Sequence, residues 1–361
     1  MSIASKSSRN KADKTRVSGV ILIDKPMGMT SQQVVSKVKY LFKSPLHDSK
    51  KAGHTGTLDP MATGLLPICL GEATKFSHYQ LDADKSYQTT ILLGQQTDTG
   101  DADGQVIDQT AIPSLNKTLL DEVTKQFLGA QQQIPPMYSA LKKEGKKLYE
   151  YARAGIEIER EPRFINIKFL ELTLINAQQL QLTVTCTKGT YVRVLAEDIA
   201  KALGTLGHLI SLRRIKVGDF IVDNALTLEQ LESLEHEQRL AQLMPVDACI
   251  DIEAELVLSA EQGIRVRQGQ RLNVFEQITE PLKDYMVQTL IVEDAKSKAA
   301  EDDSSVDTNN LLDSRKENTD SNRPEYERTV DIRLVDECGA FIGLGAISLN
   351  GRLQPKKLVH L

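Results

Sequence analysis

Residues 53–64 read GHTGTLDPMATG and form the densest run of polar and turn-forming residues between two apolar stretches of the chain. Loops of this kind carry functional side chains more often than buried segments do. The glycines let a ligand approach the backbone closely, and Pro60 favours an extended conformation of Asp59 that fixes the direction of its carboxylate. No Gly-Lys-Ser/Thr follows, so the run is not a phosphate-binding P-loop. Because Asp-Pro also opens many turns and His54 suits a turn cap, spacing alone leaves a purely structural role open.

The segments around this loop show strand and helix patterns in mixed order. Residues 19–25 (GVILIDK) predict a strand that ends at Pro26, and a helix capped by Thr30 or Ser31 should follow to about Lys43. Residues 44 to about 67 are predicted as a loop. Further strands are predicted at 87–94, 163–175 and 180–187, and further helices at 115–128, 191–203 and 227–243. This order predicts an α+β domain built around a mixed or antiparallel sheet.

The C-terminal third predicts a second, smaller domain. Apolar patterns at 256–275 and from Thr329 onward, including FIGLGAIS, indicate a small β domain. Between them, residues from about 296 to 323 are rich in Asp, Ser and Asn, so burial cannot offset the entropy that ordering would cost. We therefore expect a disordered basic N-terminus over 1–16, a large domain over 17–250, and a domain over 251–361 interrupted by a disordered acidic insertion at about 296–323.

The net charge of −5 is concentrated in one segment. Residues 293–328 contain 11 acidic and 6 basic residues, and the remainder of the chain contains 38 of each. A neutral body can still carry basic faces that bind an anionic partner. Taken alone, each basic cluster is typical of a solvated surface. These clusters stand at Lys142, Lys143, Lys146 and Lys147, at Arg213, Arg214 and Lys216, and at Lys356 and Lys357.

Hydropathy and cysteine spacing exclude several classes of protein. No apolar run approaches the roughly 18 residues that span a bilayer, and the polar N-terminus lacks the apolar core of a secretory signal. We therefore expect a soluble, cytoplasmic protein with no membrane association. The four cysteines lie far apart and form no CxxC pair, which argues against a metal site and against a disulfide framework. They are Cys69, Cys186, Cys249 and Cys338.

The loop at 53–64 resembles the catalytic motif of the bacterial, standalone TruB-type tRNA pseudouridine-55 synthases. Five further blocks agree with the same family in the same order, so the resemblance covers about residues 19–220. They read VILIDKPMGMTS, KSYQTTILLGQQTDTGDADG, IPPMYSALKKEGKKLYEYARAG, CTKGTYVRVLAEDIAKALG and LRRIKVGDF. The resemblance implies an isomerase that converts uridine to pseudouridine at position 55 in the T loop of tRNA. It also implies no cofactor, no obligate protein partner, and a monomer that binds the T stem-loop.

The resemblance also assigns roles to single residues. Asp59 would be the catalytic aspartate, and Arg193 would pair with it. The remaining residues would bind the flipped nucleotide: His54 in the same loop, Tyr87 with its ring against the base, Tyr191 and Leu212 in the pocket, and Lys25 near the same cleft. Without the resemblance, Tyr87 and Tyr191 would be ordinary strand-edge and helix-face aromatics, Arg193 a surface residue, and Leu212 part of the core.

Two segments outside the active site resemble RNA-binding parts of the family. The basic stretch from about 134 to 163 resembles the insertion that grips the tRNA T loop, and its lysines would meet phosphates. More weakly, residues from about 256 to 361 resemble the small β-barrel, PUA-like domain that follows the catalytic domain. Two other functions stay open: a guide-dependent relative that modifies rRNA within a ribonucleoprotein, and an RNA chaperone that folds tRNA without catalysis.

Overall fold

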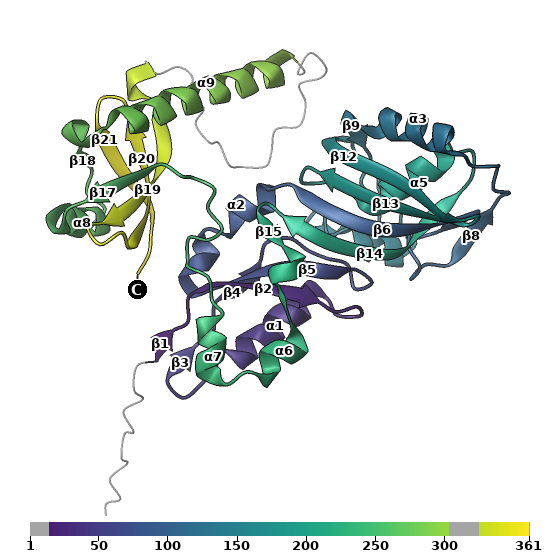
Figure 1. Ribbon diagram of the computed structural model, residues 1–361, viewed down its shortest axis with the longest axis horizontal. Helices are drawn as coiled ribbons and strands as arrows, with labels where there is room; N and C mark the ends of the chain where they lie inside the picture. Colours follow the sequence, from purple (N-terminus) through teal and green to yellow (C-terminus); the bar gives the residue numbers. More distant parts are fainter. Residues whose placement is uncertain (1–13, 303–324, 361) are drawn as a thin grey trace, which may run out of the picture. The chain divides into compact units, whose positions relative to one another are not determined.

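The computed structural model describes residues 14–302 and 325–360. Contacts divide the chain into two compact units, Met1–Cys249 and Ile250–Leu361, and each is described here by itself (Figure 1). The first unit contains a ten-stranded sheet and the second a five-stranded sheet, each covered by helices. The α+β fold class expected from the sequence is therefore confirmed. Among the described residues, no helix is both long and apolar enough to cross a membrane.

The large sheet mixes parallel and antiparallel pairs. Its central path is β16-β2-β5-β14-β6-β13-β12-β9, with β4 paired to β5 and β15 paired to β14. The strands are β2 Gly19–Lys25, β4 Ala52–His54, β5 Thr63–Leu70, β6 Lys85–Leu93, β9 Gly129–Gln133, β12 Arg163–Asn176, β13 Gln179–Cys186, β14 Gly207–Val217, β15 Phe220–Ile221 and β16 Leu226–Thr227. The strands predicted at 19–25, 87–94, 163–175 and 180–187 are thus present to within two residues.

Helix α1 (Ser31–Leu41) packs against the first part of the sheet. Thr30 is its N-cap, and a reciprocal capping box with Gln33 satisfies two backbone donors at the helix start. Its buried residues recur at helical spacing and join the β2 and β5 side chains in one core. In Figure 1 this helix lies on the same side of β2, β4 and β5 as α6 (Leu228–Ser233) and α7 (His236–Ala241).

The loop predicted from 44 to about 67 is wrong at several points, because β3 (His47–Asp48), β4 and the first residues of β5 lie within it. Pro67 led to the error at β5, since proline usually stays out of central strands. Here its carbonyl accepts a hydrogen bond from the amide of Thr55, at the point where pairing of β5 with β14 gives way to pairing with β4. The missing N–H faces that same side, away from β2, so proline leaves the pairing of β5 with β2 intact.

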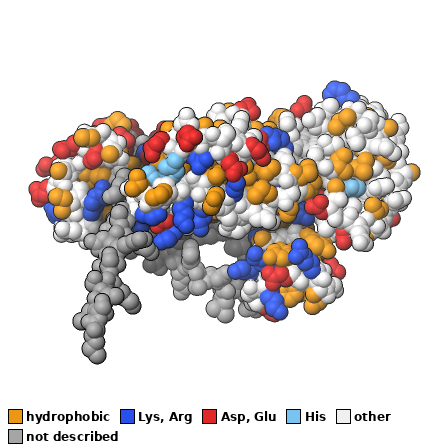
Figure 2. Space-filling view, turned by 90° about the horizontal axis from the view of Figure 1, so that it is seen from below, with side chains coloured by type: hydrophobic (Ala, Val, Ile, Leu, Met, Phe, Trp, Pro, Cys, Tyr) orange, Lys and Arg blue, Asp and Glu red, His pale blue; other side chains and the backbone are white. Residues whose placement is uncertain are grey.

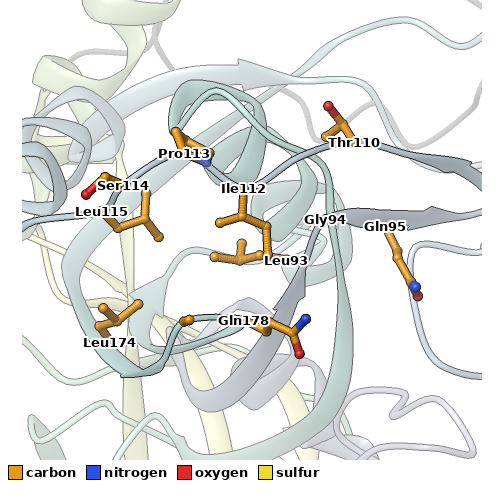
Figure 3. Close-up of a pocket in the computed structure, with 11 residues that line it drawn as sticks. Leu93, Gly94, Gln95, Thr110, Ile112, Pro113, Ser114, Leu115, Leu174 and Gln178 are labelled. Carbon is orange, nitrogen blue, oxygen red and sulfur yellow. The ribbon is translucent and has the colours of Figure 1, made fainter.

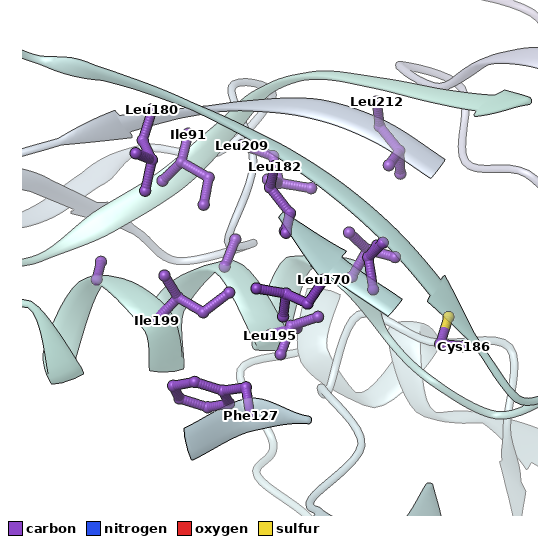
Figure 4. Close-up of a cluster of buried hydrophobic side chains, with 14 of the residues drawn as sticks. Ile91, Phe127, Leu170, Leu180, Leu182, Cys186, Leu195, Ile199, Leu209 and Leu212 are labelled. Atoms are coloured by element: carbon purple, nitrogen blue, oxygen red, sulfur yellow. The ribbon is translucent and has the colours of Figure 1, made fainter. Parts of the chain in front are cut away.

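The second part of the sheet is covered by α3 (Lys117–Phe127) and α5 (Val192–Ala202). Figure 4 shows how Leu195 and Ile199 of α5 point toward strand residues such as Leu180 and Leu182. Full burial of one such side chain contributes about 1.5–3 kcal/mol. This core therefore fixes where α5 begins, and with it the position of the side chains at the helix start.

Short elements complete the first unit. Strand β1 (Thr15–Arg16) pairs in parallel with β3 (His47–Asp48), so the last residues of the predicted disordered N-terminus are ordered, while residues 1–13 lie outside the described residues. One helix was predicted over 227–243, but α6 and α7 are separate because Glu235 starts a new capping box. The other elements are α2 Ser77–Asp82, β7 Gln95–Thr97, β8 Val106–Gln109, β10 Lys142–Lys143, β11 Lys146–Lys147 and α4 Leu148–Arg153.

The second unit is built on the sheet β17-β19-β20-β21-β18. Its helix α9 was not predicted, and it buries Leu282, Met286 and Leu290 at four-residue spacing in the core of this unit. Because α9 continues to Asp302, the first residues of the predicted acidic disordered insertion are helical; residues 303–324 lie outside the described part. The elements are β17 Glu255–Leu258, α8 Ala260–Arg267, β18 Leu272–Asn273, α9 Glu280–Asp302, β19 Thr329–Asp336, β20 Phe341–Ser348 and β21 Arg352–Leu358.

Gly64 of β5 generates a prediction about stability. Its φ is +101°, and a Cβ atom there would lie 2.3 Å from the carbonyl oxygen of Arg214 on β14. We expect Gly64→Ala to lower the free energy of unfolding by about 3 kcal/mol, through backbone strain and overpacking. Urea unfolding measures this. The matched control is Gly53→Ala, because a Cβ at Gly53 meets no atom within 4 Å; equal losses in both variants would contradict the steric argument.

Candidate functional site

Asp59 lies in the loop between β4 and β5, and the backbone on each side of it is held by α1 and the segment before it. The hydroxyl of Ser31 accepts from the amide of Leu58 (2.8 Å) and donates to its carbonyl (3.1 Å). The amide of Gly28 donates to the carbonyl of Pro60 (2.8 Å). The carboxylate itself is 39% exposed. The loop thus presents Asp59 from a fixed backbone, as the Asp-Pro pair predicted.

Lys25 lies behind this loop and does not line the cleft. Its side chain is fully buried, and Nζ donates to the carbonyls of Pro26 (2.9 Å), Met29 (2.6 Å) and Pro60 (3.3 Å). Burial lowers the pKa of Lys25 to about 8, with Asp59 acting in the opposite direction. Its three donors hold the backbone beside Asp59, and a contact between Lys25 and the substrate stays a prediction.

The guanidinium of Arg193 contacts four oxygen atoms from three parts of the chain. Nη2 lies 3.1 Å from Oδ2 of Asp59, which is the ion pair expected from the sequence, and donates to the carbonyl of Tyr138 (2.8 Å). Nη1 donates to the carbonyl of Thr99 (2.9 Å) and lies 3.5 Å from Oδ2 of Asp101. Arg193 is the second residue of α5 and is 6% exposed. One buried cation therefore sets the position of the Asp59 carboxylate.

Burial and charge act against each other at Asp59. Burial raises the pKa of its carboxyl group, Arg193 lowers it, Asp101 raises it and Lys25 lowers it, with a net rise above the ordinary value. A carboxylate with a raised pKa is a better base and nucleophile than a fully solvated one. The two cations keep that carboxylate ionised despite its burial.

A cavity of about 310 Å³ opens in front of Asp59. Of the residues predicted from the sequence, Asp59, Tyr87, Tyr191, Arg193 and Leu212 all line it. Its walls combine aromatic and aliphatic side chains with a few polar groups, which is the usual make-up of a small-molecule site. The structure therefore brings together residues that are 153 positions apart in the chain, from the β4–β5 loop to β14.

The two tyrosines are held from opposite sides. Tyr87 on β6 lies beside Arg214 in the β6–β14 register, and burial raises the pKa of its phenol while Arg214 opposes the rise. Tyr191 is the N-cap residue of α5. Both of its backbone polar groups bond to the side chain of Gln133, the last residue of β9, at 2.8 Å and 3.2 Å. These contacts fix where both rings enter the cavity.

His54 has the role of a turn cap in the structure. Its Nδ1 atom accepts a hydrogen bond from the amide of Gly56 (3.2 Å), so the neutral ring carries its proton on Nε2. Burial and the nearby Arg214 lower the pKa of the ring. His54 does not line the cavity. A contact between His54 and the nucleotide stays a prediction.

Sequence reasoning missed two charged residues of the site. Arg214 was grouped with a surface cluster, yet it is 1% exposed and donates to the carbonyls of Leu65 (2.8 Å) and Gly56 (3.1 Å). The alternation of side chains along a strand could have indicated this burial, because Leu212 faces inward and residue 214 lies on the same face. Arg213 faces the other side and forms a bidentate pair with Asp24. Asp101 carried no local signal, because only the fold brings it to Arg193.

A larger cavity, of about 800 Å³, lies elsewhere in the first unit between the ends of β6 and β12 and the segment before α3 (Figure 3). Its lining includes Leu93, Gln95, Ile112 and Gln178, and no ionisable side chain. It lacks the groups that acid–base or nucleophilic chemistry needs. The smaller cavity at Asp59 is therefore the candidate active site. No cluster of three or more His, Cys, Asp or Glu side chains suited to a metal ion occurs among the residues that are described.

The basic segment from about 134 to 163 projects lysines from a tight hairpin. Strands β10 and β11 pair so that Lys142 faces Lys147 and Lys143 faces Lys146. On the face shown in Figure 2, Lys and Arg side chains form several groups separated by acidic and hydrophobic ones. Such mixed surfaces supply local positive potential without a large net charge.

Three family descriptions match the chain in sequence: the TruB family pseudouridylate synthase N-terminal domain over residues 43–192, the tRNA pseudouridylate synthase B C-terminal domain over 193–251, and the pseudouridine synthase II TruB C-terminal domain over 323–359. The tRNA pseudouridine synthase B of Psychrobacter cryohalolentis is 67% identical over the full length of both chains. That of Dechloromonas aromatica is 50% identical over 70% of this chain and 83% of its own.

Solved structures show the same fold at low identity. A structure of an H/ACA RNP bound to a substrate RNA containing 2′-deoxyuridine has a chain that matches with a TM-score of 0.59 and 19% identity, covering 95% of this chain and 85% of that one. A chain in the Cbf5-Nop10-Gar1 complex matches with a TM-score of 0.56 and 21% identity, covering 92% and 79%. Fold, site geometry and close relatives agree, and this chain belongs to the TruB family of pseudouridine synthases.

Proposed function

We propose that this protein is a tRNA pseudouridine-55 synthase that isomerises uridine in the T loop. The observation that carries the proposal is the ion pair between Asp59 and the buried Arg193, on the wall of a cavity that also presents Tyr87 and Leu212. Relatives that are 50–67% identical to this chain are tRNA pseudouridine synthases B. The tRNA is its substrate, and the T loop is the part of the tRNA that enters this cavity.

The reaction needs a single well-placed carboxylate. The C1′–N1 bond of uridine breaks, the uracil turns, and a C5–C1′ bond forms; the proton leaves C5 and a proton returns to N1, with no net oxidation. In this scheme Asp59 acts either as a nucleophile or as a base at the sugar, and Arg193 keeps it ionised and directed at the ribose. The uracil never leaves the cavity, so no cofactor has to carry it.

The target nucleotide must leave the folded RNA loop before Asp59 can reach it. In our proposal the ring of Tyr87 stacks on the flipped uracil while Leu212 covers its other side. Stacking of one base on an aromatic ring contributes about 1–3 kcal/mol, which offsets much of the unstacking cost. Tyr191 closes the cavity, and His54 fills space near the vacated position.

Most contacts that bind the RNA lie outside the cavity in this proposal. We assign contacts with phosphates of the T stem-loop to the lysines of β10 and β11, and further RNA contacts to the PUA-like second unit. With its own insertion, the enzyme needs no guide RNA and no obligate protein partner, and it works as a monomer in the cytoplasm. An RNA-folding role without catalysis is the second candidate, and the variant described next separates the two.

Asp59→Asn is the decisive variant. Asparagine keeps the size of the side chain but can neither attack the sugar nor act as its base, so tritium release from C5-labelled uridine in a tRNA transcript should fall by ~10³-fold or more. The assay contains no guide RNA. Full release by the variant would reject the role of Asp59, and a variant that loses release but restores tRNA folding in cells would favour the chaperone function.

Arg193→Gln tests the electrostatics of the site. Because Arg193 lowers the pKa of Asp59, its removal should raise that pKa, and the acidic limb of the kcat profile should move to higher pH. At neutral pH we expect kcat to fall by roughly 10²-fold, because the carboxylate is misplaced. The matched control is Arg213→Gln, whose pair with Asp24 lies on the other face of β14. An acidic limb that stays in place in Arg193→Gln would contradict this assignment.

A further inference from the structure

Ser139 places a buried hydroxyl group in the active-site cavity, next to the phenol of Tyr191. The residue is 5% exposed and lines the cavity together with Asp59 and Tyr191. Its Oγ atom makes no hydrogen bond of normal length and angle, and its interaction with Tyr191 is looser than such a bond. Four buried side-chain atoms share this property in the described part of the chain, and of their residues only Ser139 lines this cavity.

The position of this hydroxyl is set by the backbone around it. The amide of Ser139 donates to the carbonyl of Met137 (2.9 Å), and its carbonyl accepts from the amide of Tyr149 at the start of α4 (3.1 Å). The preceding carbonyl, that of Tyr138, accepts from Nη2 of Arg193 (2.8 Å). Ser139 is therefore tied on one side to the RNA-gripping segment and on the other to the cation that holds Asp59.

The chemical environment favours a polar partner that arrives with the substrate. A buried hydroxyl without a partner destabilises a protein, and alanine would fill almost the same space without that cost. The residues that follow, Ala140 and Leu141, supply no polar side chain to the cavity. Burial raises the pKa of the Tyr191 phenol and a contact with Ser139 opposes the rise, which places the two hydroxyls near each other. Both can donate to one oxygen atom.

We propose that Ser139 is a substrate-binding residue whose hydroxyl bonds to an oxygen of the flipped uridine, either a uracil carbonyl or the 2′-hydroxyl. This inference deepens the function proposed above and rests on it. The bond forms only after the nucleotide has entered the cavity. Ser139 thereby links occupancy of the cavity to the segment that grips the RNA, because the same short stretch contacts both the nucleotide and Arg193.

The test compares two buried serines: the hydroxyl of one faces the cavity, and the hydroxyl of the other is hydrogen-bonded within the fold. Ser139→Ala should lower kcat/KM for tRNA about tenfold, while the melting temperature stays the same or rises. Ser49→Ala is the matched control: Ser49 is 3% exposed, lies outside the cavity, and its hydroxyl donates to the carbonyl of Lys39 (2.5 Å). It should lower the melting temperature and leave kcat/KM unchanged.

Two results with Ser139→Ala would overturn the inference. A kcat/KM within twofold of the wild-type value would show that the hydroxyl makes no useful contact with the substrate. A lower melting temperature together with lower activity would assign the hydroxyl to the fold. If the wild-type enzyme itself releases no tritium, the proposed function fails instead, so the two failures are distinguishable.

The contacted oxygen is identified by binding in an Asp59→Asn background, which leaves the RNA unmodified. Dissociation constants are measured for T stem-loops whose target is uridine, 2′-deoxyuridine, 2-thiouridine or 4-thiouridine. Ser139→Ala should raise the dissociation constant of the uridine RNA about tenfold. It should leave unchanged the dissociation constant of the analogue that lacks the contacted oxygen. An equal loss of affinity for all four RNAs would overturn the assignment of Ser139 to these oxygens.

Discussion

A single buried guanidinium is the constraint on which the active site depends. Arg193 stands at the first turn of α5, so the core beneath that helix determines where the charge lies. Two carboxylates and two carbonyls converge on it from three segments of the chain. A buried cation with fewer acceptors would be costly, and the pKa of Asp59 would rise further with fewer cations beside it. Each group therefore stabilises the ionised form of the other.

The rest of the catalytic domain holds the backbone around this pair. Lys25 and Arg214 are both fully buried, and both donate to carbonyls of the loop or strand next to Asp59. Neither has a carboxylate partner among the ion pairs of the described residues. Their charge is balanced by carbonyl dipoles, which leaves the carboxylate of Asp59 available for chemistry. Gly64 permits this arrangement because only a residue without Cβ fits between the two strands.

Sequence alone predicted those parts of the fold that depend on local pattern. The strand at 19–25, the helix that Thr30 caps, and the long strands β12 and β13 follow from periodicity and capping. The start of strand β5 was missed because its sequence looks like the end of a loop, and only the neighbouring strands show that Pro67 leaves the pairing of β5 with β2 intact. The resemblance predicted the roles of Asp59 and Arg193. Contacts between distant segments decide three further features that it did not give: the place of Asp101, the inward direction of Arg214 and the burial of Lys25.

The attachment of the basic segment 134–163 has an evolutionary consequence. Gln133, the last residue of β9, bonds to both backbone groups of Tyr191, so the chain is fastened to the start of α5 just before that segment leaves the sheet. At the far end, β12 resumes pairing with β9 at Arg163. Between these two anchors, Tyr138 bonds to Arg193 and Ser139 lines the cavity. The hairpin of β10 and β11 beyond them can change in length and charge without disturbing the ion pair of Asp59 and Arg193. Substrate preference can therefore diversify in this lineage while the chemistry stays fixed.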